Sequence, residues 1–184
     1  MLATGIRVRG ELRRQDWRGE RAVLGELTYS WQTVAMKKVR FHSLDSIGYH
    51  PLDLPRLTLD TTGFWLAPGP AAWQAVTRRG LNPVEGLMGV RNLYLTLLAM
   101  LGMCDPADLG GVIDSSNLGR PALFLFDRHP GGLGFCEQGW ARLDELARAA
   151  LEHLEACGCQ DGCPACVGLP NLRPAQQQDP DLQR

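Results

Sequence analysis

Four cysteines near the end of the chain have the spacing that most clearly indicates chemistry. Cys157, Cys159, Cys163 and Cys166 form a C-x-C-x3-C-x2-C pattern within ten residues. Structural zinc prefers a tetrahedral shell of four thiolates, and the interspersed glycines permit turns that direct the sulfurs inward. A disulfide between Cys157 and Cys159 would be strained. We therefore predict one structural Zn²⁺ held by all four cysteines, in a closed site without an open catalytic position.

Other uses of the four cysteines stay open at this point. An iron–sulfur cluster also takes four thiolates, and a redox-active pair could form at Cys163 and Cys166. The cysteines could also be unligated thiols. His153 lies one helical turn before Cys157 and could replace one ligand. Zinc is the preferred interpretation because four closely spaced cysteines complete its shell without another donor.

The remaining groups give weaker catalytic signals. Cys136 follows a glycine-rich loop and would need a base to act as a nucleophile, and His129 is the nearby candidate. Asp105, Asp108 and Asp114 could suggest a site for a hard cation, but loop acids are usually only solvated, and Asp108 is expected to cap a turn. The sequence has no nucleotide-binding lysine loop, DEAD/DEAH-like box or convincing triad. We expect no catalytic site on this chain alone.

Two further segments each allow two interpretations. The loop from Asp127 to Gly134 could present backbone N–H groups to a nucleic-acid phosphate, or its glycines could form a tight turn under the cysteines. The segment from Asp60 to Trp65 contains a Phe-Trp pair that could stack on bases. Such a pair at a strand end is more often part of the core, which is the interpretation we favour.

Positive charge is concentrated in the first part of the chain. The formal net charge is -1, yet residues 1–40 contain nine Lys/Arg against four Asp/Glu. These side chains could face a polyanion, or they could line the solvated side of edge strands. A zinc ion with four thiolates is formally negative and has acidic neighbours, so we place any nucleic-acid surface away from it. The candidate nucleic-acid-binding residues are Lys37, Lys38, Arg40, Arg13, Arg14, Gly131 and Gly132.

The cysteines and basic residues must be positioned by a mixture of strands and helices. Alternating apolar residues predict strands. These expected strands cover residues 6–13, 22–31, 33–44 and 57–66, with a hairpin turn at 16–19 and a loop at 42–55. The almost wholly apolar run 121–127 predicts a strand that is buried on both faces.

Two helices are clear in the sequence, and a weaker one covers residues 71–79. The first begins at Asn82, with Pro83 at its first position and Glu85 three residues after the cap. The second runs from about residue 138 to 156 and leads directly into the cysteines. The fold class is therefore α+β: a single domain with an antiparallel or mixed sheet, two main helices and a C-terminal four-cysteine zinc knuckle.

The composition is that of an ordinary globular protein, with 45% hydrophobic and 21% charged residues. We find no secretory signal peptide, and the apolar stretch 93–103 is too short to span a bilayer. We expect a cytoplasmic protein without a membrane partner, in which cysteines serve as ligands or buried thiols. The expected domain covers residues 1–170, and residues 171–184 are expected to form a disordered polar tail.

Several motifs in the same order resemble one known family. They are Leu59-Asp-Thr-Thr-Gly-Phe-Trp65, Cys104-Asp105 with Asp108-Leu-Gly-Gly111, Phe126-Asp127 with Pro130-Gly-Gly-Leu-Gly134, and the four cysteines. Over roughly residues 25–170 the chain resembles the DUF1998 domain, or MrfA-type zinc-binding domain. That family usually forms the C-terminus of superfamily 2 DEAD/DEAH-box DNA helicases of the mitomycin repair factor type and their Hrq relatives. It also occurs in the DrmB component of DISARM anti-phage systems.

The resemblance implies that the four cysteines bind zinc and that the chain serves an ATP-dependent helicase in DNA repair. The chain lacks both RecA-like lobes, so the motor would be a partner in cis or in trans. The leading hypothesis is an accessory domain that braces the motor and helps to guide DNA. The alternative is a protein-docking module of an anti-phage defence or repair complex, with no DNA contact of its own.

Overall fold

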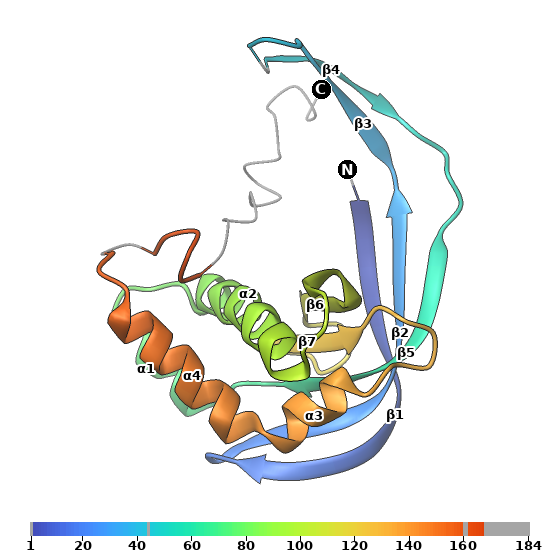
Figure 1. Ribbon diagram of the computed structural model, residues 1–184. Helices are drawn as coiled ribbons and strands as arrows, with labels where there is room; N and C mark the ends of the chain where they lie inside the picture. Colours follow the sequence, from blue (N-terminus) through green and yellow to red (C-terminus); the bar gives the residue numbers. More distant parts are fainter. Residues whose placement is uncertain (1, 44, 160–161, 168–184) are drawn as a thin grey trace.

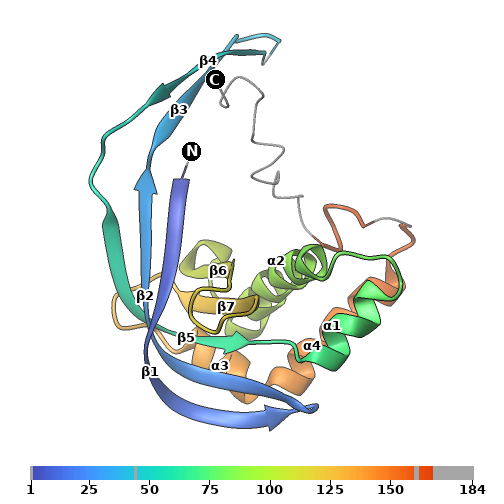
Figure 2. The same cartoon turned by 180° about the vertical axis from the view of Figure 1, so that it is seen from behind.

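A strongly curved antiparallel sheet carries the fold, and the main helices pack against one of its faces (Figures 1 and 2). The computed structural model describes residues 2–43, 45–159 and 162–167, so the predicted disordered tail 171–184 lies outside the described residues. The sheet has the strand order β1-β2-β5-β7-β6, and β3 and β4 form a separate two-stranded sheet. The prediction of an α+β fold with an antiparallel sheet is confirmed.

The strands and helices have the following bounds. The strands are β1 (Leu2–Trp17), β2 (Glu20–Thr33), β3 (Ala35–Val39), β4 (Ser46–Pro51), β5 (Leu57–Leu66), β6 (Leu109–Asp114) and β7 (Ala122–Asp127). The helices are α1 (Pro70–Thr77), α2 (Pro83–Gly102), the short 3₁₀ helix η1 (Pro106–Asp108), α3 (Phe135–Ala141) and α4 (Leu143–Ala156).

A long hairpin of β1 and β2 forms one side of the sheet. Its turn lies at Arg18 and Gly19, which have φ values of 53° and 80°. A two-residue hairpin turn of this kind needs positive φ at both positions, which suits the right-handed twist of the strands. The predicted turn at residues 16–19 is therefore confirmed.

The sheet separates two apolar cores. On the helix side, Leu24, Phe64 and Leu125 pack with residues of α2, α3 and α4. On the opposite side, Leu27 and Trp65 belong to a second buried cluster, in which Trp65 stacks on Phe124. All six residues of β7 are buried, as predicted for a strand with core on both faces. Residues 61–66 are also buried, which confirms that the Phe-Trp pair is core.

The side chain of Asn117 helps to close the second core. Its Oδ1 accepts the N–H of Val8 at 2.9 Å, and its Nδ2 donates to the carbonyl of Ile6 at 2.8 Å. The amide therefore pairs with the edge of β1 as a neighbouring strand would, and it links β1 to the connection between β6 and β7. These contacts hold the curved sheet closed over the second core.

Helix α2 begins where the sequence predicts. The Asn82 side chain accepts the N–H of Val84 at 3.0 Å, and the helix ends at Met103, which has a φ of 48°. The sequence prediction considered only the apolar stretch 93–103, but the whole helix α2 is long and apolar enough to cross a membrane by length and composition alone. In this fold Leu93 and Leu98 are buried in the core between the sheet and the other helices.

The predicted helix over 138–156 is wrong in one respect, because it is two helices. The chain breaks at Arg142, where φ is -116° and ψ is 31°. Gly139 of α3 packs so closely on α2 that an added Cβ would lie 2.5 Å from Leu98 Cδ1. The change of direction lets α4 bury its own stripe. Two acids in its first turn, Asp144 and Glu145, were the sequence signal for this second start.

One expected strand, one expected loop and one expected turn also need correction. The expected strand 33–44 is shorter, because β3 ends at Val39, and the expected loop 42–55 contains β4. The turn expected near Asp108 is instead η1 followed directly by β6. Each correction involves pairing between consecutive strands, β3 with β4 and β6 with β7, whose register the apolar pattern alone did not reveal. Residues 34–43 and 45–56, which we call the arm, project beyond the helices (Figures 1 and 2).

Candidate metal centre

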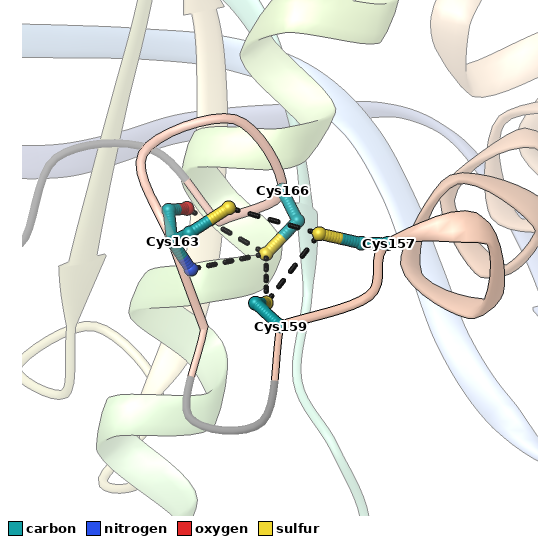
Figure 3. Close-up of side chains that lie close together, drawn as sticks. All are labelled: Cys157, Cys159, Cys163 and Cys166. Carbon is teal, nitrogen blue, oxygen red and sulfur yellow. Dashed lines mark hydrogen bonds between the residues drawn. The ribbon is translucent and has the colours of Figure 1, made fainter.

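The four cysteines converge on one point after α4. Cys157 caps that helix, and the other three follow on a loop in which Gly162 has a φ of 83°. Figure 3 shows their side chains pointing toward one another. The sulfur of Cys157 lies 3.4 Å from that of Cys159 and 3.7 Å from that of Cys163, and the sulfurs of Cys159 and Cys166 are 3.4 Å apart. We call residues 157–159 and 162–167 the knuckle.

These separations fit one tetrahedral metal ion. A Zn–S bond of about 2.3 Å places tetrahedral sulfurs about 3.8 Å apart, and all four sulfurs here lie within 4.8 Å of one another. A multi-iron cluster would need room for its own sulfides, which sulfurs in near contact do not leave. Among the described residues, this is the only group of three or more His, Cys, Asp or Glu side chains that could hold a metal. The four cysteines are therefore positioned to hold a single zinc.

Backbone groups of the knuckle prepare one thiol to become a thiolate. The N–H groups of Cys166 and Ala165 lower the pKa of Cys163 to about 7. Hydrogen bonds with the side chains of Cys157 and Cys166 raise the pKa of Cys159 to about 12. Of Cys159 and Cys163, it is therefore Cys163 that can lose its proton and bind the ion near neutral pH.

Two helices hold the knuckle in place. Nε2 of His153, on the last turn of α4, donates to the carbonyl of Ala165 at 2.8 Å. Nδ2 of Asn92, on α2, donates to the carbonyl of Val167 at 2.8 Å. His153 is thus occupied by the knuckle backbone rather than aimed at the metal. Sequence reasoning missed both supports, since nothing local indicates that α2 lies beside the knuckle.

The structure argues against a nucleophilic Cys136. Its side chain is fully buried, and burial together with the nearby Asp127 carboxylate raises the pKa of the thiol well above its ordinary value. His129, the base it would need, instead lies 2.9 Å from Asp108 Oδ1. A buried thiol that keeps its proton is a poor nucleophile.

The glycine-rich loop surrounds a carboxylate that belongs to the chain itself. The buried side chain of Asp127 accepts N–H groups from Leu133 at 2.6 Å, Gly134 at 2.8 Å and Cys136 at 3.0 Å. Backbone donors at the start of α3 therefore already bind an anion. An acid between a buried strand and a helix start was the sequence signal for this role.

The two glycines named as nucleic-acid candidates are also engaged within the fold. Gly131 donates its N–H to the carbonyl of Asp60 at 2.9 Å, and Gly132 donates to that of His129 at 3.0 Å. An added Cβ on Gly132 would lie 2.9 Å from Thr62 Cβ, so the loop approaches β5 closely. This geometry supports a tight turn, but the turn packs on β5 rather than under the cysteines. The phosphate contact stays a prediction, and the N–H groups of Gly131 and Gly132 are not free to make it.

The basic candidates do not form one stripe. Arg14 pairs with Val23 near the β1–β2 turn, whereas Lys37 and Lys38 lie on β3 in the arm. The path along the strands from Val23 to Lys37 is about 45 Å at the usual rise per residue. Arg14 forms an ion pair with Glu11 at 2.7 Å.

The other basic candidates divide in the same way. The guanidinium of Arg13 lies 6.0 Å from the ring centroid of Trp140, on α3, so it belongs with Arg14 at the helix end of the sheet. Arg40 follows β3 in the arm, close to Lys37 and Lys38. Contact of any of these side chains with nucleic acid stays a prediction.

The three loop acids considered as a cation site do not cluster. Asp105 accepts the N–H of Ala107 at 2.8 Å, and Asp114 accepts that of Ser116 at 2.9 Å, so each stabilises its own turn. Asp108 pairs with His129 instead.

Comparison with known proteins places this geometry in a family. Residues 90–167, which include most of α2 and the knuckle, match the model of the MrfA Zn-binding domain. The uncharacterized ATP-dependent helicase YprA of Bacillus subtilis is 31% identical over 146 residues, which covers 78% of this chain and 19% of that protein. The ATP-dependent helicase hrq1 of Schizosaccharomyces pombe is 24% identical over 135 residues, covering 64% of this chain and 12% of that protein.

Solved structures agree on the fold. The crystal structure of the DUF1998 helicase MrfA bound to DNA has a TM-score of 0.69 and 24% identity, and it covers 99% of this chain and 24% of that chain. The chain thus spans about a quarter or less of the length of these three relatives. Its cysteine geometry, the matched family model and the shared fold lead to the same conclusion. The resemblance to the MrfA Zn-binding, or DUF1998, domain is thus confirmed over residues 90–167.

Proposed function

We propose that this chain is the accessory zinc domain of a superfamily 2 ATP-dependent DNA helicase that acts in DNA repair. In this role it braces the motor and helps to guide a DNA strand. The observation that carries the proposal is its zinc-binding fold, which it shares with relatives named as ATP-dependent helicases. RecA-like lobes would supply ATP hydrolysis, in the same polypeptide or as a separate protein. We further propose a cytoplasmic location, because its free cysteines suit a reducing compartment.

An exposed apolar surface supports docking on a motor. The strand register places Tyr29 beside Ile6 and Leu59, and Trp31 beside Leu57, so that the second core, which includes Ile6, continues toward the exposed Leu57. The rings of Tyr29 and Trp31 stack with their centroids 5.4 Å apart. Leu57 is 51% exposed. Apolar groups that remain together at a surface are typical of interaction sites.

The basic arm supports contact with DNA. It carries Lys37, Lys38 and Arg40 on exposed positions, away from the knuckle. Glu152 and Glu155 beside the knuckle are exposed and acidic, so phosphate would favour the arm. The related MrfA has been crystallised bound to DNA, which makes a strand-guiding role worth testing in this chain.

A purely protein-docking module is the second candidate function. The engaged N–H groups of Gly131 and Gly132 favour it, because they remove one predicted phosphate site. The overall net charge of -1 favours it as well, since it provides no general attraction to nucleic acid.

Titration with a fluorescent single-stranded oligonucleotide at two salt concentrations separates the two functions. Strand guiding predicts binding that weakens steeply with salt as counterions are released. Removing two cations in Lys37→Ala/Lys38→Ala should lower the salt slope by about two units. The matched control, Arg78→Ala/Arg79→Ala, also removes two adjacent cations but lies after α1, and should leave the slope unchanged. Absence of binding at low salt would favour the docking module.

Bracing is tested separately, by co-elution of this chain with RecA-like helicase lobes encoded in the same genome. Leu57→Asp should abolish co-elution if the apolar strand face docks on the motor. Leu151→Asp is the matched control, because Leu151 is 55% exposed and lies on α4. Equal co-elution of both variants would argue against docking through this face.

A further inference from the structure

The end of the arm presents an aromatic ring to solvent. Phe41 is 89% exposed, and its ring meets that of His42 edge-on, with ring centroids 5.1 Å apart. The turn that carries it is closed by the N–H of Arg40, which donates to the carbonyl of Asp45 at 3.0 Å. Exposing a phenyl ring to water is unfavourable, and a ligand that covers the ring would remove this apolar surface from water.

The fold offers the ring no core of its own. The arm consists of β3 and β4, which pair with each other and form a sheet separate from the main one. A two-stranded ribbon without a further layer cannot bury a large side chain. Figures 1 and 2 show the labelled strands β3 and β4 far from α2, α3 and α4.

Exposed cations lie close to the ring in sequence. Lys38 and Arg40 are exposed, and Lys37 Nζ lies 5.6 Å from the centroid of the Tyr49 ring. Within the described residues, Lys37, Lys38 and Arg40 form no ion pair. Residues 34–56 hold four Lys/Arg against two Asp/Glu in a chain whose net charge is -1, so the arm is its basic part.

We propose that the arm end binds single-stranded nucleic acid, with an unpaired base stacked on Phe41 and neighbouring phosphates contacted by Lys37, Lys38 and Arg40. Aromatic rings interleaved with cations are the usual platform for such strands. A base in a duplex has both faces covered by its neighbours, so an exposed ring selects unpaired bases. This inference rests on the proposed role in strand guiding and names the kind of strand and the contact.

A protein partner is the competing occupant. Met36, Val39 and Ile47 are between 44% and 61% exposed, and an apolar partner could cover them together with Phe41. The exposed cations Lys38 and Arg40, next to Phe41 in sequence, favour a polyanion over such a partner. The two occupants make different demands on position 41, because stacking needs a flat π face whereas apolar docking needs only volume.

The experiment measures fluorescence anisotropy of an oligothymidine of about 15 nucleotides, near the upper site size of a single OB fold, and of a duplex of equal length. Variants Phe41→Ala, Phe41→Leu and Phe41→Trp are compared with the wild-type chain. The Ala and Leu variants should bind the single strand about tenfold more weakly, and the Trp variant should bind as the wild type does. The salt slope should stay unchanged in all three, because no phosphate contact is lost.

Duplex binding and a distant control complete the design. Duplex affinity should change little in the Phe41 variants. Met103→Ala removes a side chain that is 94% exposed at the end of α2 and should leave single-strand binding intact. Thermal unfolding midpoints of the Phe41 variants should equal that of the wild type, since the ring supports no core.

Three results would overturn the inference. If Phe41→Leu binds the single strand like the wild type, position 41 acts through apolar volume and protein docking is favoured. If all variants bind equally, the strand lies elsewhere, and the inference fails while the proposed strand guiding stands. If the wild-type chain binds no single strand at low salt, both strand guiding and the inference fail, whereas the bracing role is still judged by co-elution.

Discussion

The knuckle and the arm both extend from the same core, but they are held in different ways. In the knuckle, four sulfurs within 4.8 Å of one another can share an ion, and Cys166 is 2% exposed. The arm has neither a metal site nor an apolar layer, and it continues the direction of β2 and β5 as a pair of strands. A metal can replace a hydrophobic core in a short segment, whereas a strand pair without either stays open to a partner.

The two regions also carry charges of opposite sign. Glu152 and Glu155 make the surface before the knuckle acidic, and Lys37, Lys38 and Arg40 make the arm basic. The region that closes on a metal thus stabilises the fold, and the region that exposes cations and an aromatic ring is suited to contact. The predictions below test how far this division holds.

The largest expected effect is on the knuckle. Elemental analysis should find about one zinc per wild-type chain and none in Cys163→Ser/Cys166→Ser. The variant should lose metal-binding energy on the order of 10 kcal/mol. Amide hydrogen exchange should become fast after Ala156 while β5 and β7 stay protected, because they have their own core. Cys104→Ser is the control and should keep its zinc. Full retention of metal and protection in the double variant would contradict the role of the knuckle.

The second prediction concerns the buried carboxylate that holds the loop before α3. Asp127→Asn replaces a fully buried acceptor of three N–H groups by an amide that also carries donors. Unfolding free energy in urea should fall by about 3 kcal/mol, the cost of unsatisfied buried groups beside a charged acceptor. Unlike the cysteine double variant, this change should leave zinc stoichiometry intact. Asp144→Asn, at a carboxylate that is 76% exposed, should cost less than about 0.5 kcal/mol. An equal loss of unfolding free energy in the two variants would contradict the proposed role of Asp127.

A smaller effect is expected where the knuckle meets α4. His153→Ala removes the donor to the carbonyl of Ala165 and should weaken zinc binding about tenfold, as is typical when a group that orients a metal site is lost. His153→Gln, which keeps an N–H donor, should recover most of the affinity. Competition with a chromophoric chelator measures both. If Gln is no better than Ala, the hydrogen bond does not position the knuckle.

Zinc retention should also depend on pH. The pKa of Cys163 is lowered from 9.0 to about 7, so its contribution is fully present above pH 9 and is lost as the pH falls through 7. Each pH unit below 7 should therefore weaken zinc binding by about tenfold for this thiolate alone. The raised pKa of Cys159 acts in the same direction, because the proton on this thiol competes with zinc at every pH below about 12 and more strongly as the pH falls. Chelator competition at pH 8 and pH 6 checks the direction; tighter binding at pH 6 would refute it.

Much of the candidate site was predictable because its determinants are local. Four cysteines within ten residues bring their own ligands together, and the cap at Asn82 starts α2 without help from elsewhere. The turn at Arg18 and Gly19 likewise follows from neighbouring residues. Each of these features is settled by backbone geometry over a few positions.

Other features were decided only when distant segments met. Asn117 became a substitute strand for β1, from which it is separated by 109 residues of sequence at its contact with Val8. The fold also separated Arg14 from Lys37 although both lie in one basic stretch of sequence. The sequence by itself thus determined the metal ligands, since short-range geometry governs them. The tertiary structure decided which charges share a surface, since strand pairing acts over many residues and has no local signature.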